Sequence, residues 1–239
     1  MPEVDLLVPV KSLSQAKTRL RGAADDGLAD LAAHARLAMA LIRDTVAAAR
    51  AAGGVHQVLA VTSDPEVTAV LTADGVPVLP DRPERGLNAA LAYGAEVLRA
   101  RRPARPIGAL QADLPALRPA ELAAALAAAQ LAFETGVAHR AFVADAPGDG
   151  TTLLLCAPNR PLDPRFGPGS ARAHERSGAL RLAGEWPGLR RDVDTPDDLR
   201  QAVELGLGPA TAAALSPTFP AAAASVRLEY PSDGAADAH

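Results

Sequence analysis

Short apolar runs alternate with longer segments rich in Ala and Leu along most of this 239-residue chain. The short runs have the length of buried strands, and the longer segments have the spacing of helices. Strands that alternate with helices form a mostly parallel sheet covered by helices on both faces, so we predict an α/β fold. Strands are expected over residues 4–10, 55–62, 76–79, 106–112, 140–144, 152–156 and 189–193, and helices over 27–52, 86–102, 118–132 and 195–205, with short helices after Pro65 and Ser170.

The strands at 140–144 and 152–156 surround a turn and are expected to form a small antiparallel insert. We expect a single domain over residues 1–208. Residues 209–239 are rich in Ala, Pro, Ser and Thr without periodicity, which predicts a flexible tail. Aromatic residues make up only 3% of the chain, so its core must be built from Ala, Leu and Val. The apolar helices leave room for a homodimer.

Composition excludes several classes of protein. A formal net charge of −4 is unfavourable for a protein that coats nucleic acid. No apolar run reaches the roughly 18 residues of a membrane span, and the first residues lack the basic stretch of a signal peptide. Cys156 is the single cysteine, which excludes an internal disulfide and a multi-cysteine metal site. We therefore expect a cytoplasmic protein that binds neither nucleic acid nor membrane.

Charged residues follow the predicted strands in a definite pattern. In open α/β sheets, ligands bind beyond the carboxyl ends of the strands. Basic residues follow the first strand, whereas acids follow the fourth and the last strands. This polarity suits a phosphate-rich ligand held by cations and by a metal ion on carboxylates. The charged residues concerned are Lys11, Lys17, Arg19, Asp113, Asp192 and Asp194.

Three of these acids are candidate metal ligands. In a strand, Asp192 and Asp194 would face the same side, and Asp113 follows a neighbouring strand. Oxygen ligands of this kind favour Mg²⁺ or Mn²⁺ over zinc. Two structural alternatives remain open: Asp113 as the N-cap of the next helix, and Asp194 as a residue that merely precedes the capping segment 195–198.

The basic segment after the first strand has no Walker spacing, because no GxxxxGK[ST] motif occurs in the chain. Its two lysines and one arginine could still neutralise a triphosphate, or could form an ordinary solvated loop. Two glycine-rich turns, 148–152 and 167–170, resemble anion-binding turns, although hairpins and helix caps look the same. Together they fit a small phosphorylated acid bound apart from the nucleotide. No G-x-S-x-G elbow is present, which removes the usual α/β-hydrolase interpretation.

Six segments, taken together and in this order, resemble one family. They are VPVKSLSQAKTRL, GLNAAL, QADLPAL, GDGTTLL, RFGPGSARAH and RRDVDTPDDL. The chain resembles the phosphoenolpyruvate/2-phospho-L-lactate guanylyltransferases of coenzyme F420 biosynthesis over about residues 4–211. The resemblance implies a Rossmann-like nucleotidyltransferase fold. It also implies a reaction that joins GMP from GTP to the phosphate of a three-carbon acid and releases pyrophosphate.

The same resemblance implies roles for individual residues. By motif match, Asp113, Asp192 and Asp194 hold Mg²⁺, and Lys11, Lys17 and Arg19 face the GTP phosphates, with Asn88 at the nucleoside. Thr152, Gly167 and Ser170 hold phosphoenolpyruvate, with Thr151 a close second to Thr152. Catalysis depends on Asp113 and Lys17, since metal and Lys17 offset the repulsion between two anions. Asp149 departs from the family pattern, where a small or hydroxyl residue is expected.

Alternatives remain for substrate and for class. A GC-rich composition favours phosphoenolpyruvate as the acceptor over 2-phospho-L-lactate. The same fold would also serve a cytidylyl- or uridylyltransferase for another phosphorylated metabolite. A non-catalytic nucleotide-binding module is the remaining interpretation, and the retained carboxylates argue against it.

Overall fold

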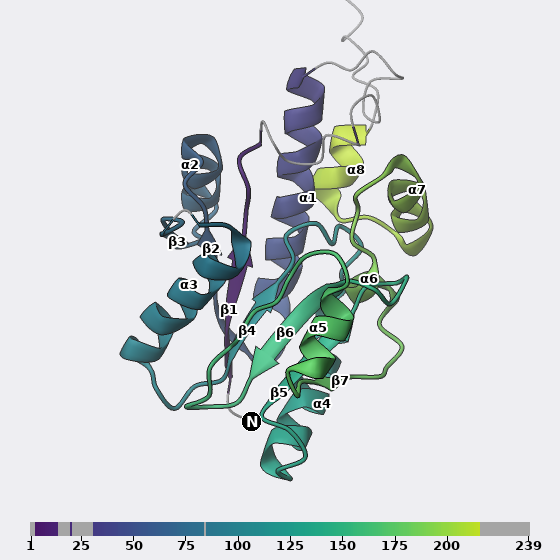
Figure 1. Ribbon diagram of the computed structural model, residues 1–239. Coiled ribbons are helices and arrows are strands. Elements are labelled where there is room, and N and C mark those ends of the chain that lie inside the picture. Colours follow the sequence, from purple (N-terminus) through teal and green to yellow (C-terminus); the bar gives the residue numbers. More distant parts are fainter. Residues whose placement is uncertain (1–2, 14–19, 21–30, 84, 216–239) are drawn as a thin grey trace, which may run out of the picture.

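The computed structural model describes residues 3–13, 20, 31–83 and 85–215, and in it a seven-stranded sheet lies between helices (Figure 1). The strand order is β3-β2-β1-β4-β6-β5-β7. Neighbouring strands pair in parallel except at β6, which runs antiparallel to β4 and β5. The strands are β1 (Val4–Pro9), β2 (Val55–Val61), β3 (Val78–Leu79), β4 (Ile107–Leu110), β5 (Arg140–Ala144), β6 (Thr151–Cys156) and β7 (Leu180–Arg181). The predicted, mostly parallel sheet is thus confirmed. Its antiparallel strand is β6, which lies between β4 and β5 within the same sheet.

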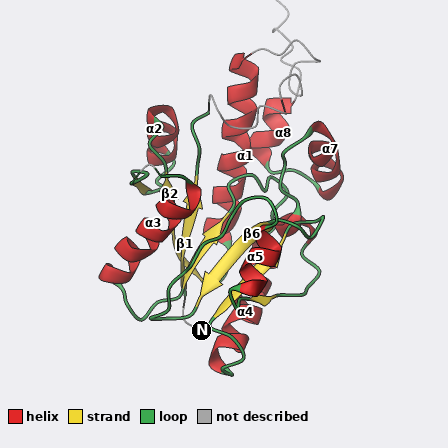
Figure 2. Ribbon diagram, in the orientation of Figure 1, coloured by secondary structure: helices red, strands yellow, loops and turns green. Residues whose placement is uncertain are grey.

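Helices cover both faces of the sheet (Figure 2). Alternate residues of β1 point to opposite faces, as the pleat requires. The helices are α1 (Leu31–Ala51), α2 (Pro65–Ala73), α3 (Leu87–Arg101), α4 (Pro119–Glu134), α5 (Ser170–Arg176), α6 (Pro187–Arg190), α7 (Pro196–Leu205) and α8 (Pro209–Leu215). Leu6 and Val8 join the core shared with α1, α2 and α4, whereas Leu7 joins the core shared with α3 and α5. None of the described helices is both long and apolar enough to cross a membrane.

Two helix starts confirm what their sequences predict. The Asp64 side chain accepts from the N–H groups of Glu66 and Val67, with Pro65 at the first position of α2. At α7, Thr195 and Asp198 form a capping box around Pro196. Both caps satisfy N–H groups that the first turn of a helix otherwise leaves unpaired.

The strand predicted over residues 189–193 is wrong. The chain instead forms the one-turn helix α6, with Pro187 in its first turn, and then a loop. Leu189 and Val193 are fully buried, but the three residues between them are charged, so the segment cannot form a buried strand. Asp192 and Asp194 therefore lie in the loop between α6 and α7, and the two-residue periodicity of a strand does not determine where they point.

The prediction of a flexible tail from residue 209 onward is also wrong for its first seven residues. Residues Pro209–Leu215 form α8, which packs beside α1 (Figure 1). The buried carboxylate of Asp44 accepts from the backbone N–H groups of Ala210 and Thr211, at 3.0 and 2.7 Å. This cap comes from a distant part of the chain, so composition alone gave no signal of the helix. Residues 216–239 lie outside the described residues.

Candidate functional site

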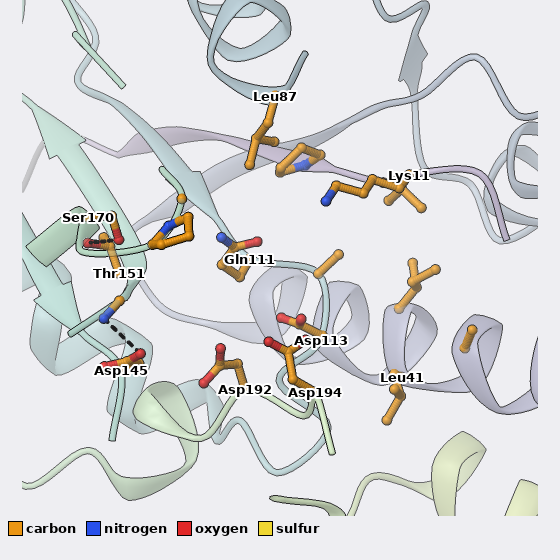
Figure 3. Close-up of a pocket in the computed structure, with 18 of the residues that line it drawn as sticks. Lys11, Leu41, Leu87, Gln111, Asp113, Asp145, Thr151, Ser170, Asp192 and Asp194 are labelled. Carbon is orange, nitrogen blue, oxygen red and sulfur yellow. Dashed lines mark hydrogen bonds between the residues drawn. The ribbon is translucent and has the colours of Figure 1, made fainter. Parts of the chain in front are cut away.

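A cavity of about 730 Å³ opens at the edge of the sheet where β1 and β4 end (Figure 3). Because β6 runs antiparallel, its first residue, Thr151, reaches the same edge as the carboxyl ends of β1 and β4. The polar and glycine residues in the wall are Lys11, Gln111, Asp113, Asp145, Asp149, Gly150, Thr151, Gly167, Ser170, Asp192 and Asp194. The cavity thus collects most of the residues predicted for the metal and for the acceptor.

Asp113, Asp192 and Asp194 all line this cavity, and their side chains lie in the same part of the view in Figure 3. The backbone N–H of Val193 donates to the carbonyl oxygen of Asp113 at 3.0 Å, which joins the two loops that carry the acids. In the described part of the chain, no group of three or more His, Cys, Asp or Glu side chains is arranged so that it could hold a metal ion. Carboxylate oxygens still fit Mg²⁺, which usually takes one or two carboxylates and completes its shell with phosphate oxygens and water.

The charge of the cavity wall is strongly negative. Its described residues include five aspartates, whereas Lys11 is the single basic residue among them. Two of the aspartates, Asp145 and Asp149, accept hydrogen bonds from backbone N–H groups. A polyphosphate would meet like charges here unless cations accompanied it. The other two basic residues expected at the phosphates, Lys17 and Arg19, lie outside the described residues.

Backbone N–H groups of both glycine turns are bound by carboxylates of the protein itself. Asp145 accepts from Gly148 at 2.7 Å and from Gly150 at 2.8 Å. Asp149 accepts from Gly169 at 3.1 Å and so ties the first turn to the second. A Cβ at Gly150 would lie 2.3 Å from an oxygen of Asp145, which explains glycine at that position. Asp149, the acid that departs from the family pattern, therefore links the two glycine turns.

The structure distinguishes the two adjacent threonines of β6. Thr151 lines the cavity, and its Oγ1 lies 3.1 Å from Oγ of Ser170. The Thr152 side chain is fully buried outside the cavity wall, and its hydroxyl donates to the carbonyl of Val143 at 3.5 Å. Of the residues expected at the acceptor, Thr151, Gly167 and Ser170 thus come together at the cavity, and Thr152 does not join them.

Comparisons with known proteins identify the family of this chain. Residues 19–181 match the MobA-like NTP transferase domain. A phosphoenolpyruvate guanylyltransferase of Salinispora arenicola is 52% identical over 92% of this chain and 97% of its own length. One from Streptomyces coelicolor is also 52% identical, over 87% of this chain and 93% of its own length. The chain belongs to the phosphoenolpyruvate guanylyltransferase family.

The solved structures support the fold assigned to this family member. A CMP:2-keto-3-deoxy-manno-octonic acid synthetase complexed with CTP superposes with a TM-score of 0.52 at 15% identity. The match covers 85% of this chain and 98% of the synthetase. The guanylyltransferase-family chain therefore has the nucleotidyltransferase fold that its motifs predicted.

The side chain of Asn88, the residue expected at the nucleoside, forms two hydrogen bonds with the backbone of Phe166. Its side-chain oxygen accepts from the N–H of Phe166 at 2.8 Å, and its side-chain nitrogen donates to the carbonyl of Phe166 at 3.0 Å. Both polar ends of the amide are thus used to hold the chain just before Gly167. Asn88 is absent from the described cavity wall, so its visible role is to fix the loop that carries Gly167 and Ser170.

Sequence reasoning passed over two parts of the wall. Ala38, Leu41 and Ile42 of α1 form an apolar side, and the spacing i, i+3, i+4 shows that one helix face carries them. Gln111, two residues before Asp113, also lines the cavity. His174 is also missing from the predicted site, although it lies 3.0 Å from Thr151 and is fully buried. A helical spacing of four from Ser170 was the available signal for it.

Proposed function

We propose that this protein transfers GMP from GTP to the phosphate of phosphoenolpyruvate. An oxygen of the acceptor phosphate forms a bond to the α-phosphorus of GTP, and the bond to the bridging oxygen of pyrophosphate breaks. The products are enolpyruvoyl-diphospho-5'-guanosine and pyrophosphate, and we place the reaction in coenzyme F420 biosynthesis. The observation that carries the proposal is the meeting of three aspartates with the Thr151–Ser170 hydroxyl pair across one cavity. The names of the 52% identical relatives support the choice of substrates.

The roles of the residues follow from their positions in the wall. Asp113, Asp192 and Asp194 would supply carboxylate ligands for Mg²⁺, with Mn²⁺ as a substitute, and phosphate oxygens of the nucleotide would complete the shell of the ion. Lys11 points toward the same cavity and would bind a phosphate oxygen as a point charge (Figure 3). Lys17 and Arg19 keep their proposed place at the GTP phosphates. The apolar side on α1 would cover the nucleoside.

The chemistry requires no covalent nucleophile, because the acceptor phosphate is already ionised. The single cysteine, Cys156, is fully buried at the far end of β6, and burial raises the pKa of its thiol. The obstacle is repulsion between two anions, so catalysis depends on charge neutralisation and on positioning. Both requirements fit a wall of aspartates that faces a pair of hydroxyls.

Donor and acceptor can be tested together. The protein is incubated with Mg²⁺ and each of GTP, ATP, CTP and UTP, paired with phosphoenolpyruvate or with 2-phospho-L-lactate. Pyrophosphate release gives the rate, and mass spectrometry identifies the product. We expect the fastest turnover with GTP and phosphoenolpyruvate. Preference for 2-phospho-L-lactate would replace the acceptor, and preference for a pyrimidine nucleotide would replace the donor.

A further inference from the structure

We propose that His174 is a positioning residue that makes the Thr151–Ser170 hydroxyl pair a hydrogen-bond donor toward the anionic acceptor substrate. This inference rests on the proposed function, because it names the groups that recognise the acceptor. The placement of hydrogen atoms in one buried network determines what this pair can donate. That network is made of Arg165, His174, Thr151 and Ser170.

The tautomer of His174 is fixed by the backbone. The N–H of Arg165 lies 3.0 Å from Nε2 of His174, and a backbone N–H can only donate. Nε2 must therefore accept, which leaves the hydrogen of the neutral ring on Nδ1. Nδ1 lies 3.0 Å from Oγ1 of Thr151, so this hydrogen points at the threonine oxygen. The ring is held between Phe142 and Phe166, with centroids 5.6 and 5.3 Å away.

The neutral ring is also the stable one at ordinary pH. Burial lowers the pKa of His174 to about 4, and the nearby charges of Arg140 and Arg165 act in the same direction. Asp163 opposes them without reversing the result. The imidazole therefore remains an uncharged donor at Nδ1 and an acceptor at Nε2 throughout the neutral range.

The Thr151–Ser170 pair has one hydroxyl hydrogen available for a ligand. The oxygen of Thr151 receives the hydrogen of His174 Nδ1 and that of the Ser170 hydroxyl, at 3.0 and 3.1 Å. The hydrogen of Thr151 itself is then left over, and no protein atom accepts it within the described part of the chain. If the bond between the two hydroxyls is reversed, the hydrogen of Ser170 is left over instead. Either way one donor remains, and both residues line the cavity.

This donor determines which ligands the wall accepts. With the hydrogen on Nε2, Nδ1 would accept from the hydroxyl pair and only lone pairs would face the cavity. A cavity with five aspartates already repels anions, so a surface of lone pairs would exclude the acceptor. The spare hydrogen instead selects an oxygen that carries negative charge, as in a phosphate or a carboxylate. His174 thereby determines that the hydroxyl pair presents a hydrogen-bond donor to the cavity, although the imidazole itself does not contact the ligand.

The test compares five variants with the wild-type protein: T151V, T151S, H174F, T151V/H174F and the control T68V. Thr68 is a matched threonine on α2, where its hydroxyl bonds to the carbonyl of Asp64. Apparent KM values for phosphoenolpyruvate and for GTP are measured separately, and thermal melting confirms that each variant is folded.

We expect T151V to raise the KM for phosphoenolpyruvate about tenfold or more, as loss of a hydrogen bond to a charged group does. The KM for GTP should change less than about twofold, and T68V should resemble the wild type. T151S keeps the hydroxyl and should therefore raise the KM for phosphoenolpyruvate less than T151V does. H174F should raise the same KM by a smaller factor, because the spare hydrogen remains but is no longer directed toward the cavity. It should add nothing in the T151V background, because His174 acts through Thr151. An unchanged KM in T151V, an equal rise for both substrates, or fully additive effects in the double variant would overturn the inference.

A second measurement is independent of turnover. The ¹⁵N NMR spectrum of the imidazole should show a neutral ring with its hydrogen on Nδ1 at pH 7. A hydrogen on Nε2, or a charged ring, would contradict the inference even in an active enzyme. Wild-type protein that does not turn over GTP and phosphoenolpyruvate would instead contradict the proposed function, so the two failures are distinguishable.

Discussion

The backbone N–H of Val193 donates a 3.0 Å hydrogen bond to the carbonyl oxygen of Asp113. This bond joins the loop after β4 to the loop before α7, two segments far apart along the chain. The side chain of Val193 is fully buried, so the loop is anchored by packing as well. Asp192 and Asp194 flank this anchor and are thereby held on the same wall as Asp113 (Figure 3).

Replacement of Asp113 by asparagine tests this wall. The substitution keeps the size of the side chain and removes its charge, so we expect kcat to fall ~10²-fold or more. Pyrophosphate release at saturating Mg²⁺ measures the effect. Asp197→Asn is the matched control, because Asp197 is exposed on α7 and pairs with Arg200 there. Turnover by Asp113→Asn close to that of the control would remove Asp113 from the metal site.

Removal of divalent ions should abolish turnover. The wall carries five aspartates, so the phosphates of GTP would enter a field of like charge without a counter-ion. With EDTA we expect pyrophosphate release to fall to background, and GTP binding measured by calorimetry to weaken. Added Mg²⁺ or Mn²⁺ should restore both. The melting temperature should barely change, because the core is held by apolar packing. Full activity in EDTA would refute a metal-dependent mechanism.

The sequence predicted the fold well because apolar runs determine which segments are buried. The run at β1 and the Ala- and Leu-rich run at α1 each gave the correct element, and the caps at Asp64 and Thr195 gave correct helix starts. The segments that failed have weak local signals. The charged stretch around α6 is anchored by two buried residues, and α8 depends on a cap from Asp44 on another helix.

In the site, too, residues with a strong local sequence signal were predicted correctly, and residues placed by distant contacts were not. The placement of Asp113 at the end of β4 followed from its position after an apolar run. The choice between Thr151 and Thr152 could not be made from sequence, because it depends on which residue begins β6 and on the register shift opposite, between Val143 and Ala144. Likewise, no local pattern indicated that Asp145 would take the N–H groups of the first glycine turn.

Thr45 on α1 holds the backbone next to Asp113. Its hydroxyl accepts from the N–H of Leu114 at 2.9 Å and donates to the carbonyl of Leu41 at 2.8 Å. Thr45→Val leaves a buried N–H unpaired, which should cost about 1–3 kcal/mol in the free energy of unfolding. Because Leu114 directly follows Asp113, kcat should also fall, by about tenfold. Urea unfolding and initial rates measure the two effects.

The control for this change is Thr45→Ser, which keeps the hydroxyl and should preserve kcat. A Thr45→Val protein that loses stability but keeps the full kcat would show that the position of Asp113 does not depend on this bond.

Asp44 should stabilise the protein through α8. Its carboxylate accepts from two N–H groups of that helix and is buried, so Asp44→Ala should lower the free energy of unfolding by about 1–3 kcal/mol. Asp74→Ala is the matched comparison, since Asp74 forms an ion pair with Arg43 nearer the surface and should lose less than about 1 kcal/mol. Urea unfolding of both variants provides the measurement. Equal losses would show that the cap from Asp44 contributes little.

The buried imidazole of His174 should make stability depend on pH. Its pKa is lowered from 6.5 to about 4 in the folded protein, mainly by burial and then by the charges of Arg140 and Arg165, against Asp163. Above pH 6.5 the ring is neutral in both the folded and the unfolded states, so it has no effect there. As the pH falls from 6.5 to 4, the unfolded state takes up a proton that the folded state does not. The free energy of unfolding should therefore fall over that interval, by about 3 kcal/mol from this group.

Other titrating groups add their own pH dependence, so the comparison must be made between variants. His174→Phe keeps a ring between Phe142 and Phe166 and removes the titration. Urea unfolding of both proteins at several values between pH 4 and pH 7 gives the difference. We expect the wild type to lose more stability than His174→Phe across this interval, although the variant starts lower because it lacks two hydrogen bonds. Parallel curves for the two proteins would mean that the ring takes up its proton equally in the folded and unfolded states, which a fully buried imidazole beside two arginines should not do.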